Sequence, residues 1–235
     1  TENEFRIFVE TYHQSDYKFE AEEFIDGTFY HCDALVQNGN IIFSFVGQYG
    51  CPNLEFTKGK IIHTLPLLKS NPLKESIIAV FDKVISVLGR IDGPYHMEVF
   101  HTPQKEIVFL EIAARTIGGG FASRYQRMYG INMYDANLLI QVGEIVQIPC
   151  IEVSEYEIVG MIPKVSGKIS DIQEPSLLSE YHIDWYVHEG DEMIDRPITL
   201  LDQAGRIRVW NQDYQELEQD FATLRNYQPF KKNIC

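Results

Sequence analysis

The stretch GPYHMEVFHTPQKEIVFLEIAARTIGGG, residues 93–120, decides the fold of this chain. Its two limbs, Tyr95 to Phe100 and Ile107 to Ala113, are rich in β-branched and aromatic residues, and Pro103 marks a turn between them. This pattern predicts a β-hairpin. Three glycines follow it, Gly118 to Gly120, and they let the backbone turn closely past a bound group.

Two glutamates are predicted to meet on one face of this hairpin. Side chains alternate between the two faces of a strand. A loop over residues 103–106 would pair Phe100 with Phe109 and would place Glu98 directly opposite Glu111. Carboxylates in that register have Cβ atoms roughly 5 Å apart and repel each other. A hard cation held by oxygen ligands is the natural compensation.

An ordinary explanation of the same pattern stays open. Two outward glutamates on a solvated face are common, and a register slip of one residue would separate Glu98 from Glu111. Arg115, four residues after Glu111, would lie near the end of the same strand. The pattern alone therefore leaves two explanations open, a metal-binding pair of carboxylates beside Arg115 and an ordinary solvated face.

The order H-M-E-V-F, a turn, and F-L-E-I-A-A-R-T-I-G-G-G resembles the C-terminal half of the ATP-grasp ligases, especially the branch that joins carboxylates to amines, including the L-amino-acid ligases. The resemblance implies that Glu98 and Glu111 carry Mg²⁺, for which Mn²⁺ can substitute, against the phosphates of ATP. It also implies that Arg115 steadies the transferred phosphoryl group or the acyl-phosphate. Ala113 stands where the family usually has asparagine as a further metal ligand, so the number of metal ions stays open.

The segment EEFIDG, which begins at Glu22, resembles the stretch of the same family that contacts adenine. The resemblance implies that backbone groups of Glu23, Phe24 and Ile25 contact the adenine edge, and that an acidic side chain near Glu22 meets its amino group. An ordinary strand with exposed glutamates is the alternative. Phe29 occupies the place where the family often has a ribose-binding glutamate, so the ribose contact stays unassigned.

An acidic composition limits the partners of this chain. Its formal net charge is −14 with a pI near 4.9, and such a surface repels phosphate backbones, so no nucleic acid partner is expected. No apolar run approaches the ~18 residues of a membrane span, and no signal segment opens the chain, so no membrane association is expected. The four cysteines show no metal or disulfide spacing, which is typical of reduced thiols in a cytoplasmic protein.

Periodicity and turn residues predict the other elements. Asn71 and Pro72 begin the clearest helix, which Gly89 ends, and Asn38-Gly39 joins two strands as a hairpin. We further expect helices over residues 5–13, 121–129, 132–142 and after Asp213, strands over 28–36 and 41–46, an extended run over 18–27, a loop over 48–65, and β-rich runs over 158–162, 182–188, 198–201 and 206–210.

Four side chains in these elements have two explanations each. Tyr49 and His63 fall in the expected loop, where they are either substrate contacts or ordinary loop residues. Arg124 and Arg127 fall on an expected helix, where they either bind a substrate carboxylate or are solvated surface charges.

These elements predict an α+β chain with the C-terminal part of the ATP-grasp fold, in which helices brace an antiparallel sheet and a small β-rich region closes it. We expect residues 1–150 to form the C-terminal part of the ATP-binding domain, and residues 151–235 to form a closing subdomain with a terminal helix. The family's two phosphate-contacting lysines and flexible glycine-rich loop find no counterpart here. The chain alone is therefore expected to be an excerpt that binds MgATP weakly and catalyses nothing.

The resemblance implies an ATP-dependent carboxylate–amine ligase that forms an amide or peptide bond through an acyl-phosphate and releases ADP and phosphate. Its implied substrates are a small-molecule carboxylate and amine, with amino acids among the candidates, and a homodimer is one assembly open to it. Two other functions stay open. One is a non-catalytic binding module, which Ala113 favours, and the other is a Mg²⁺-dependent hydrolase that uses the same carboxylates.

Overall fold

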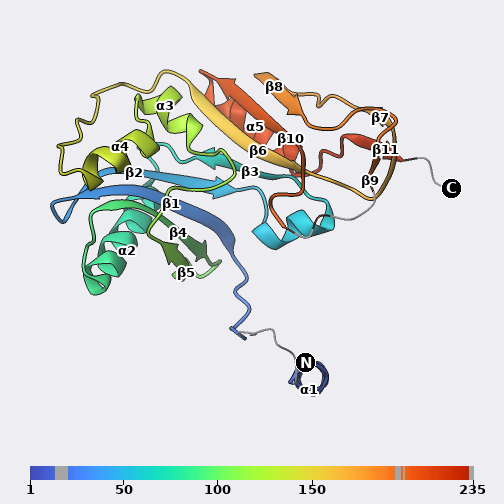
Figure 1. Ribbon diagram of the computed structural model, residues 1–235, viewed down its shortest axis with the longest axis horizontal. Helices are drawn as coiled ribbons and strands as arrows, with labels where there is room; N and C mark the ends of the chain where they lie inside the picture. The colour runs from blue at the N-terminus through green and yellow to red at the C-terminus, as the bar shows by residue number, and fades with distance from the viewer. Residues whose placement is uncertain (14–20, 194–196, 198, 233–235) are drawn as a thin grey trace.

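One large antiparallel sheet organises the computed structural model, which describes residues 1–13, 21–193, 197 and 199–232 (Figure 1). Its eight strands lie in the order β5-β4-β1-β2-β3-β6-β10-β8, and a smaller sheet has the order β11-β7-β9. The large sheet contains β1 (Thr28–Gln37), β2 (Asn40–Tyr49), β3 (Ile62–Pro66), β4 (Gly93–His101), β5 (Ile107–Ala113), β6 (Tyr156–Pro163), β8 (Glu180–Trp185) and β10 (Gln203–Asn211); the small sheet contains β7 (Gly167–Ile172), β9 (Glu192–Met193) and β11 (Phe230–Lys232).

Helices cover both faces of the large sheet. The helix α2 (Pro72–Leu88) packs on the face that carries Cys32 and Ala34 of β1. The helices α3 (Ser123–Tyr129) and α4 (Met133–Gln141) pack on the opposite face, against Phe43 and Phe45 of β2 (Figure 1). The helix α5 (Tyr214–Leu224) packs on the half of the sheet formed by β6 and β10. This arrangement confirms the expected α+β class, with an antiparallel sheet braced by helices.

The bounds of α2 follow directly from its terminal residues. The Asn71 side chain accepts a hydrogen bond from the backbone N–H of Leu73 at 3.0 Å, Pro72 occupies the first turn, and Gly89 ends the helix in the left-handed conformation. Ile77, Phe81 and Ile85 form its buried stripe. Leu88, the last residue of the helix, is 55% exposed.

The prediction of a loop over residues 48–65 is wrong for much of this segment. A 3₁₀ helix, η1 (Asn53–Lys58), and the strand β3 occupy this segment. β3 pairs with β2 on one side and β6 on the other, so it is a central strand. Its five residues, IHTLP, are too few and too mixed to show a period of two, and pairing with two neighbours overrides that weak local signal.

Two other expectations differ at the edges of the described residues. The β-rich run expected over 198–201 is not a strand, because residues 199–201 form a turn, and residue 198 lies outside the described residues. Of the extended run expected over 18–27, residues 18–20 also lie outside them, and residues 21–26 have no regular secondary structure.

The N-terminal helix α1 (Glu2–Tyr12) buries none of its residues and lies away from the sheet (Figure 1). Thr1 and Glu4 form a capping box at its start. No helix in the described part of the chain is long and apolar enough to cross a membrane.

Candidate active site

A β-bulge at the end of the sheet brings the two predicted metal ligands together. Val99 pairs with Phe109, but the next pair along the two strands is Glu98 with Glu111, so Leu110 is an extra residue in β5. In a regular ladder Glu98 would lie opposite Leu110. The bulge therefore places the second carboxylate opposite the first, a use of bulges that is common beside functional sites.

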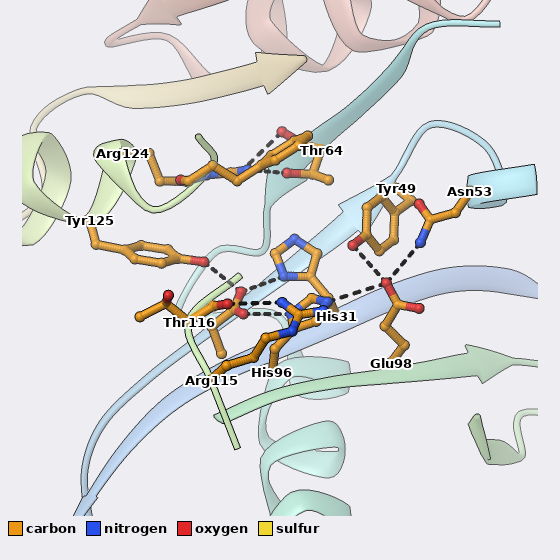
Figure 2. A network of polar contacts seen from close by, with 12 residues as sticks. His31, Tyr49, Asn53, Thr64, His96, Glu98, Arg115, Thr116, Arg124 and Tyr125 are labelled. Atoms are coloured by element: carbon orange, nitrogen blue, oxygen red, sulfur yellow. Dashed lines mark hydrogen bonds and ion pairs between the residues drawn. The ribbon is translucent and has the colours of Figure 1, made fainter. Parts of the chain in front are cut away.

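Three donors hold one oxygen of Glu98 (Figure 2). The Tyr49 hydroxyl donates to Oε1 at 2.8 Å, the Asn53 amide donates at 2.9 Å, and His96 Nε2 lies 3.3 Å from the same atom. Among the described residues no hydrogen bond reaches Oε2. The side chain is 5% exposed and held by these three donors, while its second oxygen stays available to a cation.

His96 links Glu98 to a second buried carboxylate, Asp33. Its Nδ1 lies 2.7 Å from Asp33 Oδ1 and its Nε2 faces Glu98, so both ring nitrogens face oxygens that only accept hydrogen bonds. Burial lowers the pKa of His96, but Asp33 and Glu98 raise it more, to about 9. Burial likewise raises the pKa of Glu98, but the hydrogen bond and positive charge of His96, together with the hydrogen bonds from Tyr49 and Asn53, lower it more and keep it below its ordinary value. A buried imidazolium therefore lies behind the carboxylate.

Asp33 is the centre of this network. His31 Nδ1 lies 2.5 Å from Oδ2, and the Tyr125 hydroxyl donates to the same oxygen at 2.5 Å. Burial raises the pKa of Asp33, but the two histidines lower it more, and the carboxylate is ionised. Burial lowers the pKa of His31 despite Asp33, so His31 is the neutral member and its Nε2 has no partner among the described residues. The residue types His31, Asp33 and His96 could ligate a metal, but their contacts at 2.5–2.7 Å are hydrogen bonds.

Glu111 and Arg115 are exposed and line the same cavity as Glu98, with a volume of about 210 Å³. The Nη1 of Arg115 donates to the carbonyl oxygen of Thr116 at 2.9 Å (Figure 2). The structure thus brings together all three residues predicted to hold metal and phosphate. Gly118 and Gly119 form the adjoining wall.

The four residues predicted to contact adenine line a second cavity, of about 690 Å³. Glu22, Glu23 and Phe24 are exposed, whereas Ile25 is half-buried. The opposite wall of this cavity comes from the β4–β5 hairpin, through Phe100, Val108, Phe109 and Leu110. The extra residue Leu110 therefore lines the second cavity, while its neighbour Glu111 lines the first.

Sequence reasoning placed the other candidates less well. Tyr49 is in the site, but as the last residue of β2 rather than in a loop. His63 is buried outside it, with Nε2 3.0 Å from the carbonyl oxygen of Phe221. Arg124 is fully buried and donates to Thr64, so it is not a solvated surface charge. Arg127 pairs with Glu155 at 2.7 Å.

Several site residues were missed because they come from elements that are distant in sequence from the β4–β5 hairpin. Asp33 and Asn53 carry no local motif. The same is true of Gln203 and Arg206 on β10, which line the cavity that also contains Glu98, Glu111 and Arg115, called here the metal-side cavity after its predicted ligands. The alternation FYHCD in β1 was the one available signal, because it places His31 and Asp33 on a single face.

The chain matches the family model of the ATP-grasp domain over residues 1–124, and it belongs to this family. It is 30% identical over 122 residues to the L-arginine-specific L-amino acid ligase of Bacillus subtilis, a match that covers 52% of this chain and 29% of the relative.

Solved structures share the fold. An L-amino acid ligase from Bacillus licheniformis superposes with a TM-score of 0.66 at 20% identity, over 89% of this chain and 53% of that one. A second match is the biotin carboxylase domain dimer of Hydrogenobacter thermophilus 2-oxoglutarate carboxylase, solved as its MgADP complex. It superposes with a TM-score of 0.62 at 14% identity, over 96% of this chain and 52% of that one. The chain thus spans about half the length of these solved relatives.

Proposed function

We propose that this chain is part of an ATP-dependent carboxylate–amine ligase, which forms an amide or peptide bond through an acyl-phosphate and releases ADP and phosphate. One observation carries the proposal: Glu98, Glu111 and Arg115 meet in one cavity, and the chain belongs to the ATP-grasp family. The likeness to L-amino acid ligases supports a small-molecule carboxylate and amine as substrates, with amino acids as the leading candidates.

The donor set at this site fits a hard divalent cation. Glu98 Oε2 and the exposed Glu111 carboxylate supply oxygen ligands, which Mg²⁺ prefers and Mn²⁺ accepts. A cation held by these two carboxylates would supply electrostatic stabilisation of the charge that develops during phosphoryl transfer. Tyr49, Asn53 and His96 fix the carboxylate that would hold it.

The nucleotide would extend from this pair into the larger cavity. The β4–β5 hairpin lines both cavities, so a nucleotide could extend from one into the other. In the larger cavity the adenine would be bound by Glu22, Glu23, Phe24 and Ile25. Arg115 would then orient the terminal phosphate toward the acceptor carboxylate and stabilise its charge as the phosphoryl group transfers. The amine would attack the acyl-phosphate and displace phosphate.

The two segments of the chain would divide this work. We propose that residues 1–150 belong to the ATP-binding domain and that residues 151–235 form the part that closes the site. In support, Glu98, Glu111 and the expected adenine stretch lie in the first segment, whereas Gln203 and Arg206 of the second segment line the same cavity as the two glutamates.

The test is a screen of the complete protein for ADP release over pairs of amino acids with MgATP. We expect ADP, phosphate and an amide product that appear only when both an acid and an amine are present. Release of AMP and pyrophosphate would exclude the mechanism. ADP without an amide product would indicate a hydrolase, and binding without turnover would indicate a binding module. Light scattering on the same sample would test whether it is a homodimer, as the Hydrogenobacter thermophilus domain is.

A further inference from the structure

Arg206 gives the metal-side cavity a second guanidinium. It lies on β10, three strands away from β2 in the order of the large sheet, and it lines the same cavity as Glu98, Glu111 and Arg115. Its side chain is half-buried. The proposed chemistry of phosphoryl transfer employs Arg115 and the two glutamates, and it gives no role to Arg206.

A second β-bulge and a buried amide fix this guanidinium. Gln203 pairs with Pro163 and Gly205 with Ile162, so one extra residue lies between them in β10. Residues three apart lie on opposite faces of a regular strand, but the extra residue brings Gln203 and Arg206 onto one side. Nε of Arg206 donates to Gln203 Oε1 at 2.9 Å.

The Gln203 amide is itself held in one orientation. Its side chain is 6% exposed, and Nε2 donates to the carbonyl oxygen of Leu200 at 2.7 Å, so Oε1 is the atom that faces Arg206. Besides Gln203, the guanidinium of Arg206 lies against Gly120, the last of the three glycines that follow the β4–β5 hairpin. A Cβ on Gly120 would be 2.4 Å from Nη1, and Gly120 has a φ of +79°. Arg206 is therefore positioned before any ligand binds.

This positioned cation has no anionic partner among the residues that the structure describes. Oε1 of Gln203 accepts a hydrogen bond from Nε of Arg206 and is uncharged. Asp184 lies opposite Arg206 in the neighbouring strand, but its carboxylate pairs with His182 at 3.1 Å. A guanidinium fork fits a carboxylate through two parallel N–H donors, and both terminal nitrogens remain for such a contact.

We propose that Arg206 is a specificity-determining residue that binds the unreacted carboxylate of an amino acid supplying the amine. The inference rests on the proposed function and follows from what happens to the carboxylates of the two substrates. When two amino acids are joined, the carboxylate of the first becomes the acyl-phosphate, its amine partner displaces phosphate, and the carboxylate of the second is unchanged. That spectator anion needs a cation other than Arg115, and Arg206 is the second guanidinium that lines the same cavity.

The experiment compares each amino acid with its carboxamide, which keeps the amine but has no carboxylate. In the complete protein, with MgATP and the acid substrate at saturation, Arg206→Gln should raise the KM for the amino acid about 10- to 100-fold, the scale of a lost charge-assisted hydrogen-bond pair. The KM for ATP and the kinetics with the carboxamide should stay within about twofold. Arg206→Lys, which keeps the charge without the fork, should recover part of the affinity.

Arg208→Gln is the matched control, because Arg208 is two residues further along β10 and does not line the cavity. It should leave all three KM values unchanged. An equal loss with amino acid and carboxamide, or a rise in the KM for ATP, would overturn the proposal and give Arg206 a structural or phosphate-binding role.

Calorimetry keeps this result separate from the proposed ligase activity. The twenty L-amino acids and their carboxamides would be titrated into the protein with Mg²⁺ and a non-hydrolysable ATP analogue, so no turnover is needed. We expect at least one amino acid to bind about 10- to 100-fold more tightly than its carboxamide, and Arg206→Gln to abolish the difference. Equal binding of each pair, or no binding of any amino acid, would refute the role of Arg206 even if the wild-type protein releases ADP.

Discussion

His96 lies directly opposite Ala113 across the β4–β5 pair. Ala113 holds the position at which ATP-grasp ligases usually carry a metal-ligating asparagine, and in this chain its cross-strand neighbour is the buried histidine that spans Asp33 and Glu98. The site therefore has two carboxylates, no amide ligand on β5 at this position, and a buried cation behind Glu98.

Ala113→Asn should restore an oxygen ligand at the site. We expect the Mg²⁺ concentration for half-maximal activity of the complete protein to fall several-fold, because each added oxygen ligand strengthens binding of a hard cation. Ala113→Val adds bulk without a ligand and is the control. If both variants respond to Mg²⁺ as the wild type does, the position takes no part in metal binding.

Glu111→Gln should remove the negative charge that we propose for metal binding while keeping the shape of the side chain. We expect turnover to fall by about two orders of magnitude or more, the scale of losing one preorganised electrostatic group. Glu106→Gln, in the turn of the same hairpin and outside both cavities, is the control. Turnover within a few-fold of wild type in Glu111→Gln would show that Glu111 does not hold the metal.

Arg115→Ala should lower kcat more than it raises the KM for ATP, because the guanidinium is needed most as the phosphoryl group transfers. Steady-state kinetics over ATP concentration separate the two effects. Lys83→Ala, an exposed residue of α2, controls for the loss of a positive charge. A rise in the KM for ATP with kcat unchanged would make Arg115 a nucleotide-binding residue only.

Tyr49→Phe tests the donors that hold Glu98. The variant keeps the ring but removes the hydroxyl that donates to Oε1 at 2.8 Å. Partners of metal ligands are worth about 10- to 100-fold in metal affinity, so Mg²⁺ should bind about tenfold more weakly. Tyr134→Phe, at an exposed position of α4, should change nothing. Unchanged Mg²⁺ affinity in Tyr49→Phe would mean that the hydroxyl is not needed to position the carboxylate.

His63 should make the fold sensitive to acid. Burial lowers its pKa from 6.5 to about 4, against the raising effect of the carbonyl oxygens of Phe221 and Ile61, and the charge of Arg225, just after α5, also lowers it. Between these two values the unfolded chain binds the proton and the folded chain does not, so stability falls as the pH falls from 6.5 toward 4.

His63→Gln keeps a hydrogen-bond donor and does not titrate. From pH 7 to pH 4.5 the wild type should lose about 2–3 kcal/mol of unfolding free energy more than this variant, since one pKa unit corresponds to about 1.4 kcal/mol. Urea denaturation at both pH values measures the difference. Parallel losses in the two proteins would show that His63 does not cause the acid sensitivity.

The hairpin was predictable from local pattern, but its exact register was not. The expected pairing of Phe100 with Phe109 is wrong, because Phe100 pairs with Val108. The pairing of Glu98 with Glu111 nonetheless holds, since the turn is one residue different from the expected one and the bulge at Leu110 offsets that difference. Alternation along a strand carries no signal for an extra residue.

The far side of the site could not be predicted from the sequence alone. Arg206 and Gln203 reach the cavity only because β10 joins the sheet beside β6, a pairing between segments about forty residues apart. Likewise Tyr49 and Asn53 reach Glu98 through the order of strands, not through any spacing in the sequence. Local periodicity defines elements, whereas the order of strands in a sheet depends on long-range contacts.

The two bulges make the positions of the site's side chains depend on the number of residues in β5 and β10. One extra residue in β5 places Glu111, and one extra residue in β10 places Arg206 beside Gln203. A related chain could keep every one of these side chains and still lose the arrangement by deleting a single neighbour that touches no substrate. Single-residue gaps in these two strands would therefore be expected to separate members of the family that share this pocket from members that do not, even where their pocket residues are identical.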